Sequence, residues 1–208
     1  MSKLIKTTWL AVALIFLSCA NEKEEKQDEV VVKNPSEKVI VIDAGHGGVD
    51  QGSKIKSAIE KEITLKIAQK IKELNTDENL KILFTRHDDS FVSLSDRVMM
   101  TNNQAPYLLL SLHINVSNNP EDAGAEVYFY KGNYEQESLA MAEKFQEHFE
   151  AETTIVKEGT FYVLKQVQAP ALHLYLGYLS NEMDYKKLIS EHGQATLAET
   201  ILNSLKTI

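Results

Sequence analysis

The sequence is 208 residues long, with 43% hydrophobic and 25% charged residues and a formal net charge of −8 at pH 7. This length suffices for one domain with a sizeable core. Because proteins that bind nucleic acid need a basic patch, the acidic balance and the lack of interleaved basic and aromatic residues argue against a nucleic-acid partner.

The first residues have the layout of a secretory signal. Two early lysines give a positive start, and residues 9–17 form an apolar run that is too short to span a bilayer. The run leads into Phe-Leu-Ser-Cys, which resembles the cleavage box of bacterial lipoproteins, and Cys19 is the only cysteine in the chain. An ordinary signal peptide with an incidental cysteine is the alternative. We expect residues 1–18 to be a lipoprotein signal peptide and Cys19 to carry the lipid.

This expectation places the protein in the cell envelope, exported and anchored to a membrane through Cys19, in the periplasm or on the outer surface. Residues 19–37 are mostly charged and polar, so they cannot bury apolar surface and are predicted to form a solvated tether. A single cysteine allows no internal disulfide, so packing alone must hold the exported domain, residues 38–208.

From Val39 onward, strand and helix patterns alternate along the chain. A short apolar run beginning at Val39 predicts a buried strand, and apolar residues at helical spacing predict a helix over 57–74. The elements expected next are a strand at 80–85, a helix at 93–103, strands at 107–113 and 124–130, a helix at 134–150, strands at 161–164 and 171–176, and one or two helices over 184–205 with a break at Gly193. This alternation predicts a single α/β domain with a mostly parallel sheet of about six strands and helices on both faces.

Two histidines lie at the ends of buried strands. His46 sits on a glycine-rich turn after the first strand, and His113 ends the third. In a parallel sheet both then lie at the carboxyl edge, where open α/β folds place their sites. Each histidine alone has a plain structural interpretation, but the matched positions of the two favour a shared ligand.

Glu60 is a third candidate, with two interpretations. The sequence Ser57-Ala-Ile-Glu60 fits a capping box, in which the glutamate bonds back to the helix start. The same residue follows the His46 loop closely, and its side chain can face the same edge of the sheet. Two histidines and one glutamate, with a water in the fourth position, form an open catalytic zinc site.

A series of segments resembles the zinc-dependent N-acetylmuramoyl-L-alanine amidases of the type-3 class. The resemblance implies that His46, Glu60 and His113 bind Zn²⁺, and that a six-stranded α/β domain cleaves peptidoglycan between N-acetylmuramic acid and L-alanine. The segments span nearly all of residues 39–205 in order: Asp43-Ala-Gly-His-Gly-Gly-Val-Asp50, Glu60-Lys-Glu-Ile-Thr-Leu65, Thr85-Arg86, Leu94-Ser-Asp-Arg97, Ser111-Leu-His113, Gly124-Ala-Glu-Val-Tyr128, Phe161-Tyr-Val-Leu-Lys165 and Leu176-Gly-Tyr-Leu-Ser-Asn181.

The chain departs from this family at one catalytic position. Within residues 170–177, Tyr175 stands where the family has a catalytic glutamate. Tyrosine titrates near 10, so at neutral pH it can donate a hydrogen bond to an oxyanion but is a poor base. His173, two residues earlier on the strand, and Glu126 are candidate substitutes. A core histidine and a surface or ion-paired glutamate are the alternative interpretations.

Three hypotheses for function follow. The first is a peptidoglycan amidase that uses a zinc-activated water and is weakened by Tyr175. The second is an inactive zinc-binding lipoprotein that binds or regulates the wall on the same scaffold, and the third is a zinc hydrolase acting on another amide. We expect a monomer, and we expect structural roles for Arg86, Arg97 and Asp50.

Overall fold

The computed structural model describes residues 36–149 and 154–208, so the expected signal peptide, Cys19 and nearly all of the tether lie outside the described residues. Within these two ranges, no helix has both the length and the apolar character needed to cross a membrane. The strands are β1 (Lys38–Ala44), β2 (Lys54–Ile55), β3 (Ala58–Ile59), β4 (Leu80–Phe84), β5 (Leu108–Asn115), β6 (Glu126–Phe129), β7 (Ile155–Glu158) and β8 (Ala171–Tyr178). The helices are α1 (Glu60–Leu74), α2 (Leu94–Asn102), α3 (Glu135–His148), α4 (Tyr162–Gln166), α5 (Glu182–Ile189) and α6 (Glu191–Thr207).

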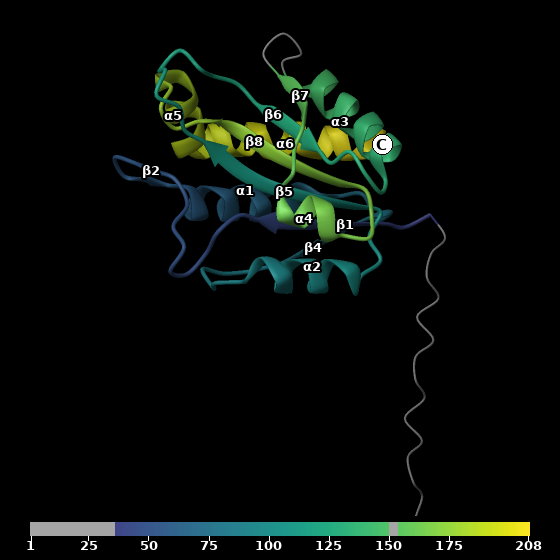
Figure 1. Ribbon diagram of the computed structural model, residues 1–208. Helices are drawn as coiled ribbons and strands as arrows, with labels where there is room; N and C mark the ends of the chain where they lie inside the picture. The colour runs from purple at the N-terminus through teal and green to yellow at the C-terminus, as the bar shows by residue number, and fades with distance from the viewer. Residues whose placement is uncertain (1–35, 150–153) are drawn as a thin grey trace, which may run out of the picture. The chain divides into compact units, whose positions relative to one another are not determined.

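One six-stranded sheet, in the order β4-β1-β5-β8-β6-β7, forms the centre of the domain (Figure 1). Strands β4, β1, β5 and β8 are parallel, whereas β6 is antiparallel to β8 and parallel to β7. Strands β2 and β3 form a separate antiparallel hairpin before α1. The predicted α/β class and the mostly parallel sheet of about six strands are therefore confirmed.

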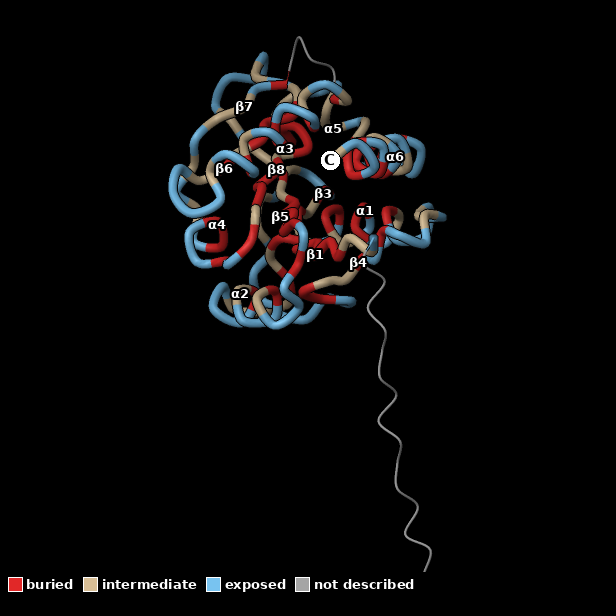
Figure 2. Tube along the Cα trace, turned by 90° about the vertical axis from the view of Figure 1, so that its right-hand side faces the viewer, coloured by how far each residue is buried: buried red, intermediate tan, exposed pale blue. Residues whose placement is uncertain are grey.

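The two faces of the sheet are covered differently, because alternate residues of a strand point to opposite faces. On one face, Ile40 and Leu110 pack with residues of α1, α3 and α6 in the larger core. On the other, Val41 and Leu109 pack with α4 in a smaller cluster, which Val98 of α2 joins. Figure 2 shows α1 and α6 on one side of the buried strands and α2 and α4 on the other. The smaller cluster covers only part of this second face of the sheet, and polar residues occupy the rest.

Helix α1 fixes the larger core to the sheet. Ile63, Ile67 and Ile71 recur at helical spacing on its buried face, and Ile67 and Ile71 have no exposed surface. Burial of such a side chain stabilises a fold by about 1.5–3 kcal/mol. This stripe therefore determines which side of α1 faces the sheet, and with it the direction in which Glu60 points.

The structure differs from the sequence-based expectation in the strand expected at 161–164 and in the position of the helix break near the end of the chain. Residues 162–166 form helix α4 rather than a strand at 161–164, and the strand of this region is β7, which lies earlier in the chain. An apolar run this short does not reveal its periodicity, so the sequence pattern alone cannot distinguish a helix from a strand here. The break between α5 and α6 lies at Ser190, whose hydroxyl accepts a hydrogen bond from the Gly193 N–H, so Gly193 belongs to α6.

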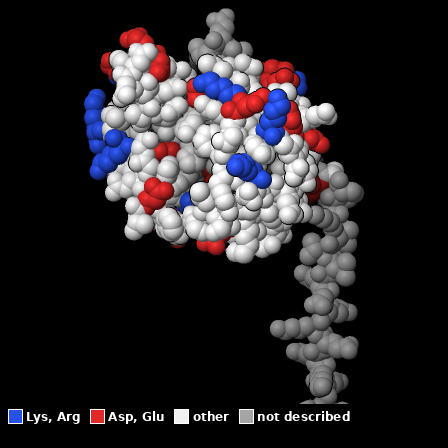
Figure 3. All heavy atoms as spheres, in the orientation of Figure 1, with Lys and Arg blue, Asp and Glu red and all other residues white. Residues whose placement is uncertain are grey.

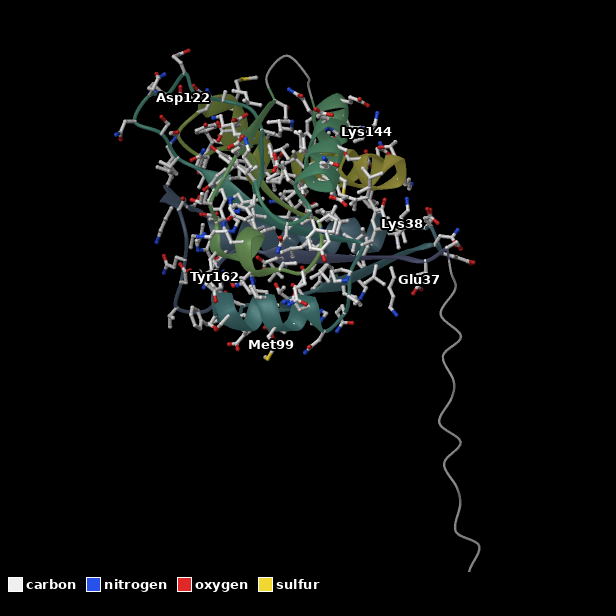
Figure 4. The ribbon with its side chains drawn as sticks, turned by 45° about the vertical axis from the view of Figure 1, so that its right-hand side comes forward. Glu37, Lys38, Met99, Asp122, Lys144 and Tyr162 are labelled. Carbon is white, nitrogen blue, oxygen red and sulfur yellow. The ribbon has the colours of Figure 1, made fainter. Side chains whose placement is uncertain are left out.

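The two edges of the parallel strands have different roles. At the amino edge, the ammonium of Lys38 donates to the backbone carbonyl of Ile208, so the start of β1 lies beside the end of α6. At the carboxyl edge, the chain leaves β1 toward His46, and β5 carries His113 near its end. Figure 4 labels Lys38 and Tyr162 toward opposite ends of the domain. The candidate site is therefore remote from the point at which the chain enters the sheet.

Candidate active site

The loop after β1 holds His46 in a conformation that depends on glycine. His46 itself has φ 61°, and Gly47 and Gly48 have φ 127° and 58°. A Cβ on Gly45 would lie 2.3 Å from the His113 ring, and one on Gly52 would lie 2.4 Å from the His46 ring. The backbone thus approaches both rings more closely than any other residue type allows.

Glu60 enters the site from the first residue of α1 and is 2% exposed. Its Oε2 accepts from the Ser53 N–H at 2.7 Å, and its Oε1 accepts from the Ile114 N–H at 2.9 Å. The capping-box interpretation is wrong, because residues 54–59 form the β2–β3 hairpin and the helix cap, Ile59, makes no side-chain bond. The carboxylate instead points toward the carboxyl edge of the sheet.

The three predicted ligand residues converge on one point. Glu60 Oε1 lies 3.1 Å from His46 Nε2 and 2.9 Å from His113 Nδ1, and the three residues offer ligand atoms within 4.8 Å of one another. Donor atoms about 2.0–2.2 Å from a tetrahedral zinc lie roughly 3.4 Å apart, close to these separations. Two imidazoles and one carboxylate also match the donor set of catalytic zinc sites, so the residues fit this ion.

The charge balance of the cluster favours the deprotonated carboxylate. Burial alone would raise the pKa of Glu60, but hydrogen bonds from His113 and His46 outweigh burial and hold the pKa far below its usual range. Burial would lower the pKa of His46, but Glu60, and then Asp50, raise it. A metal must displace the proton that this raised pKa favours on His46, so metal binding at this cluster strengthens as the pH rises.

Polar groups behind the cluster hold His46 and its loop. Asp50 Oδ2 lies 2.8 Å from His46 Nδ1, the ring nitrogen remote from Glu60, and so orients the imidazole. Arg97, 4% exposed, pairs with Asp43 at 2.6 Å and also donates to the His46 carbonyl. Arg86 donates to the carbonyls of residues 44, 45 and 61. These contacts agree with the structural roles expected for the two arginines, whereas Asp50 contacts a candidate ligand directly.

The opposite flank of the site is aromatic. The His173 ring stacks between the rings of His113 and Phe161, with centroids 4.3 and 3.8 Å away. His173 is 3% exposed, and neither ring nitrogen has a hydrogen-bond partner within the described residues. Burial, and then the nearby His113, hold its pKa well below the ordinary value, so the ring is neutral.

Tyr175 lies beside His113 in the sheet register and lines the same cleft. Burial, followed by the negative charge of Glu60, raises the pKa of its hydroxyl to about 12. At neutral pH the hydroxyl is therefore protonated and is a hydrogen-bond donor. Tyr175 thus lies in the cleft, at the position where the sequence resemblance places the family's catalytic glutamate.

Glu126 lies opposite Tyr175 in the β6–β8 ladder, but its carboxylate is bonded to other side chains. It accepts hydrogen bonds from the hydroxyls of Tyr128 at 2.9 Å and Tyr178 at 3.0 Å, and it forms an ion pair with Lys157. The residue is 5% exposed and is absent from the cleft lining. These contacts favour the ion-paired, structural interpretation of Glu126.

A hollow of about 680 Å³ contains the cluster, with histidines and carboxylates on its floor. Its walls include three large apolar side chains that are 46–56% exposed, Phe91, Leu94 and Tyr162. Sequence reasoning did not single out these residues, although 94 and 162 lie in segments of the family resemblance. Figure 3 shows that most of the visible surface around α4 and α2 carries neither acidic nor basic groups.

Comparisons with known proteins agree with this geometry. Residues 40–207 match the family model described as N-acetylmuramoyl-L-alanine amidase. The uncharacterized protein YqiI of Bacillus subtilis is 31% identical over 172 residues, covering 81% of this chain and 83% of YqiI. The probable cell wall amidase LytH of Staphylococcus epidermidis is 30% identical over 183 residues, 86% of this chain but only 61% of LytH.

A solved structure shares the fold. The catalytic domain of CwlV, an N-acetylmuramoyl-L-alanine amidase from Bacillus (Paenibacillus) polymyxa, superimposes with a TM-score of 0.74 at 31% identity, covering 82% of this chain and 97% of that domain. The family match extends over nearly the whole described domain and includes every residue of the cleft floor. The chain belongs to the N-acetylmuramoyl-L-alanine amidase family.

Proposed function

We propose that the protein is a zinc-dependent N-acetylmuramoyl-L-alanine amidase that hydrolyses the amide between the lactyl group of N-acetylmuramic acid and L-alanine in peptidoglycan. The observation that carries the proposal is the cluster of His46, Glu60 and His113 on the floor of a cleft, in the fold of this family. A zinc ion at this point would polarise the amide carbonyl and make water nucleophilic near neutral pH.

The residues around the cluster have separate tasks in this reaction. His46, Glu60 and His113 would hold the ion, and Asp50 fixes the ring of His46 so that Nε2 faces the cluster. The protonated hydroxyl of Tyr175 donates a hydrogen bond to the oxygen on which negative charge develops. It does not take a proton from water at neutral pH, because its pKa is about 12.

The loss of a carboxylate base at this position predicts a slow enzyme rather than a dead one. A positioned acid or base contributes about 10²–10⁴ in rate, whereas binding and electrostatic stabilisation remain. Of the two candidate substitutes, His173 lines the cleft and is neutral, but Glu126 is held by two tyrosines and a lysine outside it. His173 is therefore the better placed of the two, but its lowered pKa makes it a weak base.

Digestion of purified sacculi by the full chain tests the proposal. The chain loaded with zinc should release free stem peptides, and metal analysis should find one zinc per chain. His113→Ala should lose both properties, whereas His192→Ala, at an exposed position of α6, should keep both. Retention of zinc by His113→Ala would refute the ligand assignment. Zinc binding with no peptide release, even after a glutamate replaces Tyr175, would favour the inactive wall-binding lipoprotein.

We also propose that the protein is an envelope lipoprotein anchored through Cys19. The support is the short apolar run that ends in Phe-Leu-Ser-Cys, which contains the single cysteine of the chain. The full chain should partition into membranes and incorporate labelled fatty acid, and Cys19→Ala should lose the label. Unchanged labelling of Cys19→Ala would show that the anchor lies elsewhere.

A further inference from the structure

We propose that Phe91 and Tyr162 are the two lips of a saccharide-binding cleft, which holds the glycan strand while the scissile amide lies on the floor. This inference rests on the proposed function and names the part of the substrate that the cleft walls recognise. Both residues line the hollow around the candidate metal cluster, and their side chains remain 56% and 46% exposed. Aromatic side chains so placed are available to a ligand.

Each lip is held in a fixed relation to the floor. Phe91 packs against the His46 loop so closely that a Cβ on Gly48 would lie 2.9 Å from the Phe91 Cβ. Tyr162 begins α4 directly after Phe161, whose ring stacks on His173, which in turn stacks on His113. A ligand between the lips would therefore be placed relative to His46 on one side and His113 on the other.

The charges of the cleft favour a neutral sugar over the anionic stem peptide. Among the described residues that line the cleft, Arg97 is the only lysine or arginine, and it is buried and paired with Asp43. Glu60 and the half-exposed Asp50 add negative charge to the floor. A divalent ion would neutralise the floor but would leave the walls without a cation for a peptide carboxylate. The walls offer apolar faces instead, which suit the C–H faces and N-acetyl methyl groups of amino sugars.

A second hollow, of about 590 Å³, extends the aromatic surface beyond the first. Phe161 lines both hollows, and Tyr128 and Tyr130 line the second. The close packing of glycine backbone on these rings keeps their position, since a Cβ on Gly159 would lie 2.8–2.9 Å from the Phe161 and Tyr128 rings. Because Phe161 joins the two hollows, aromatic side chains extend over a length that suits a polymer longer than one disaccharide.

Calorimetric titration of the zinc-loaded full chain tests the inference without turnover, because neither probe contains the scissile amide. The probes are neutral N-acetylglucosamine oligosaccharides of defined length, which lack the lactyl carboxylate of a peptide-free wall strand, and, separately, free stem peptide. The wild type should bind the glycan, with affinity that rises from disaccharide to tetrasaccharide. Phe91→Ala and Tyr162→Ala should each weaken glycan binding about 3–10-fold. Tyr162→Trp, which keeps an aromatic face, should retain it.

Tyr107→Ala is the matched control, because Tyr107 is 38% exposed but lies just before β5, at the amino edge of the sheet. It should bind glycan like the wild type. The inference is overturned if the wild type binds only stem peptide or neither probe, or if both lip variants bind glycan as Tyr107→Ala does. Peptide release from sacculi is measured separately. Cleavage without glycan binding overturns only the saccharide-binding role of Phe91 and Tyr162. Glycan binding without cleavage, by the wild type and by Tyr175→Glu alike, overturns only the amidase proposal.

Discussion

The two flanks of the cleft hold their polar groups in different ways. On the metal flank, formed by the His46 loop, Glu60 and β5, the side chains of Asp43, Arg97 and Glu60 are buried with several partners each. On the aromatic flank, formed by β8, β6 and α4, His173 is buried among rings without a hydrogen bond. The first flank is thus fixed by polar contacts before any ligand arrives. The second is fixed by stacking, and it contains Tyr175, at which the sequence resemblance predicts the departure from the family.

The largest effect should come from breaking the polar support of the metal flank with Asp43→Asn. This carboxylate accepts from Thr85, Arg97 and Ser111, so the variant would leave the Arg97 guanidinium buried without its counter-charge. We expect a loss of about 3–5 kcal/mol in the free energy of unfolding, measured by urea denaturation. The exposed pair of Glu182 with Lys186 supplies the control, and Glu182→Gln should change little.

The same carboxylate has a defined pH dependence. Burial would raise the pKa of Asp43, but the charge of Arg97 and the bond from Thr85 lower it below the ordinary 3.8. A lowered pKa in the folded state means that the contribution to stability is complete above about pH 4 and is lost as the pH falls further. A wild-type stability loss between pH 7 and 5 that Asp43→Asn abolishes would contradict this assignment.

The next effect concerns the aromatic flank. Tyr175→Glu should speed peptide release from sacculi about 10–1000-fold, because it restores an acid/base group whose placement is imperfect. Tyr175→Phe is the informative partner, since it removes only the hydroxyl. It should be slower than the wild type if the hydroxyl donates to the oxyanion. Equal rates for wild type and Tyr175→Glu would show that another group, such as His173, already supplies the base.

A smaller effect is expected from the group that orients His46. Asp50→Ala should reduce zinc affinity about 10–100-fold, the usual consequence of removing a carboxylate behind a metal-binding histidine. Asp50→Asn should lose less, because its amide oxygen can still accept from His46 Nδ1. Competition with a chromophoric chelator measures both variants. If Asp50→Ala bound zinc as tightly as the wild type, Asp50 would only maintain the shape of the loop and would not support the zinc ligand His46.

The smallest effect tests the unpartnered imidazole. His173→Phe keeps the stack between His113 and Phe161 but removes two buried nitrogens without partners, so it should raise the free energy of unfolding by about 1 kcal/mol. Thermal or urea unfolding measures the change. A loss of stability would mean that the nitrogens bind water in the folded state. Unchanged peptide release by the same variant would exclude His173 as the base.

Sequence patterns predicted the metal flank better than the aromatic one. His46 and His113 follow neighbouring parallel strands, so their meeting at one edge is a consequence of topology that a sequence reveals. Glu60 had a local interpretation as a cap, but the hairpin at 54–59 and the buried stripe of α1 together turn it toward the site. Phe91 and Tyr162 come from segments about seventy residues apart, and their presence in one cleft depends on how α2 and α4 pack, which periodicity does not encode.

The opposite placement of Lys38 and the cleft has a consequence for where the protein works. With Cys19 in a membrane, the 19 residues before Lys38 limit the start of β1 to roughly 60–70 Å from the bilayer. The chain enters at the amino edge of the sheet and the cleft lies at its carboxyl edge, so the thickness of the domain adds to this reach. If both proposals hold, the enzyme would cleave only the bonds within this distance of its own patch of membrane and would leave more distant wall uncut.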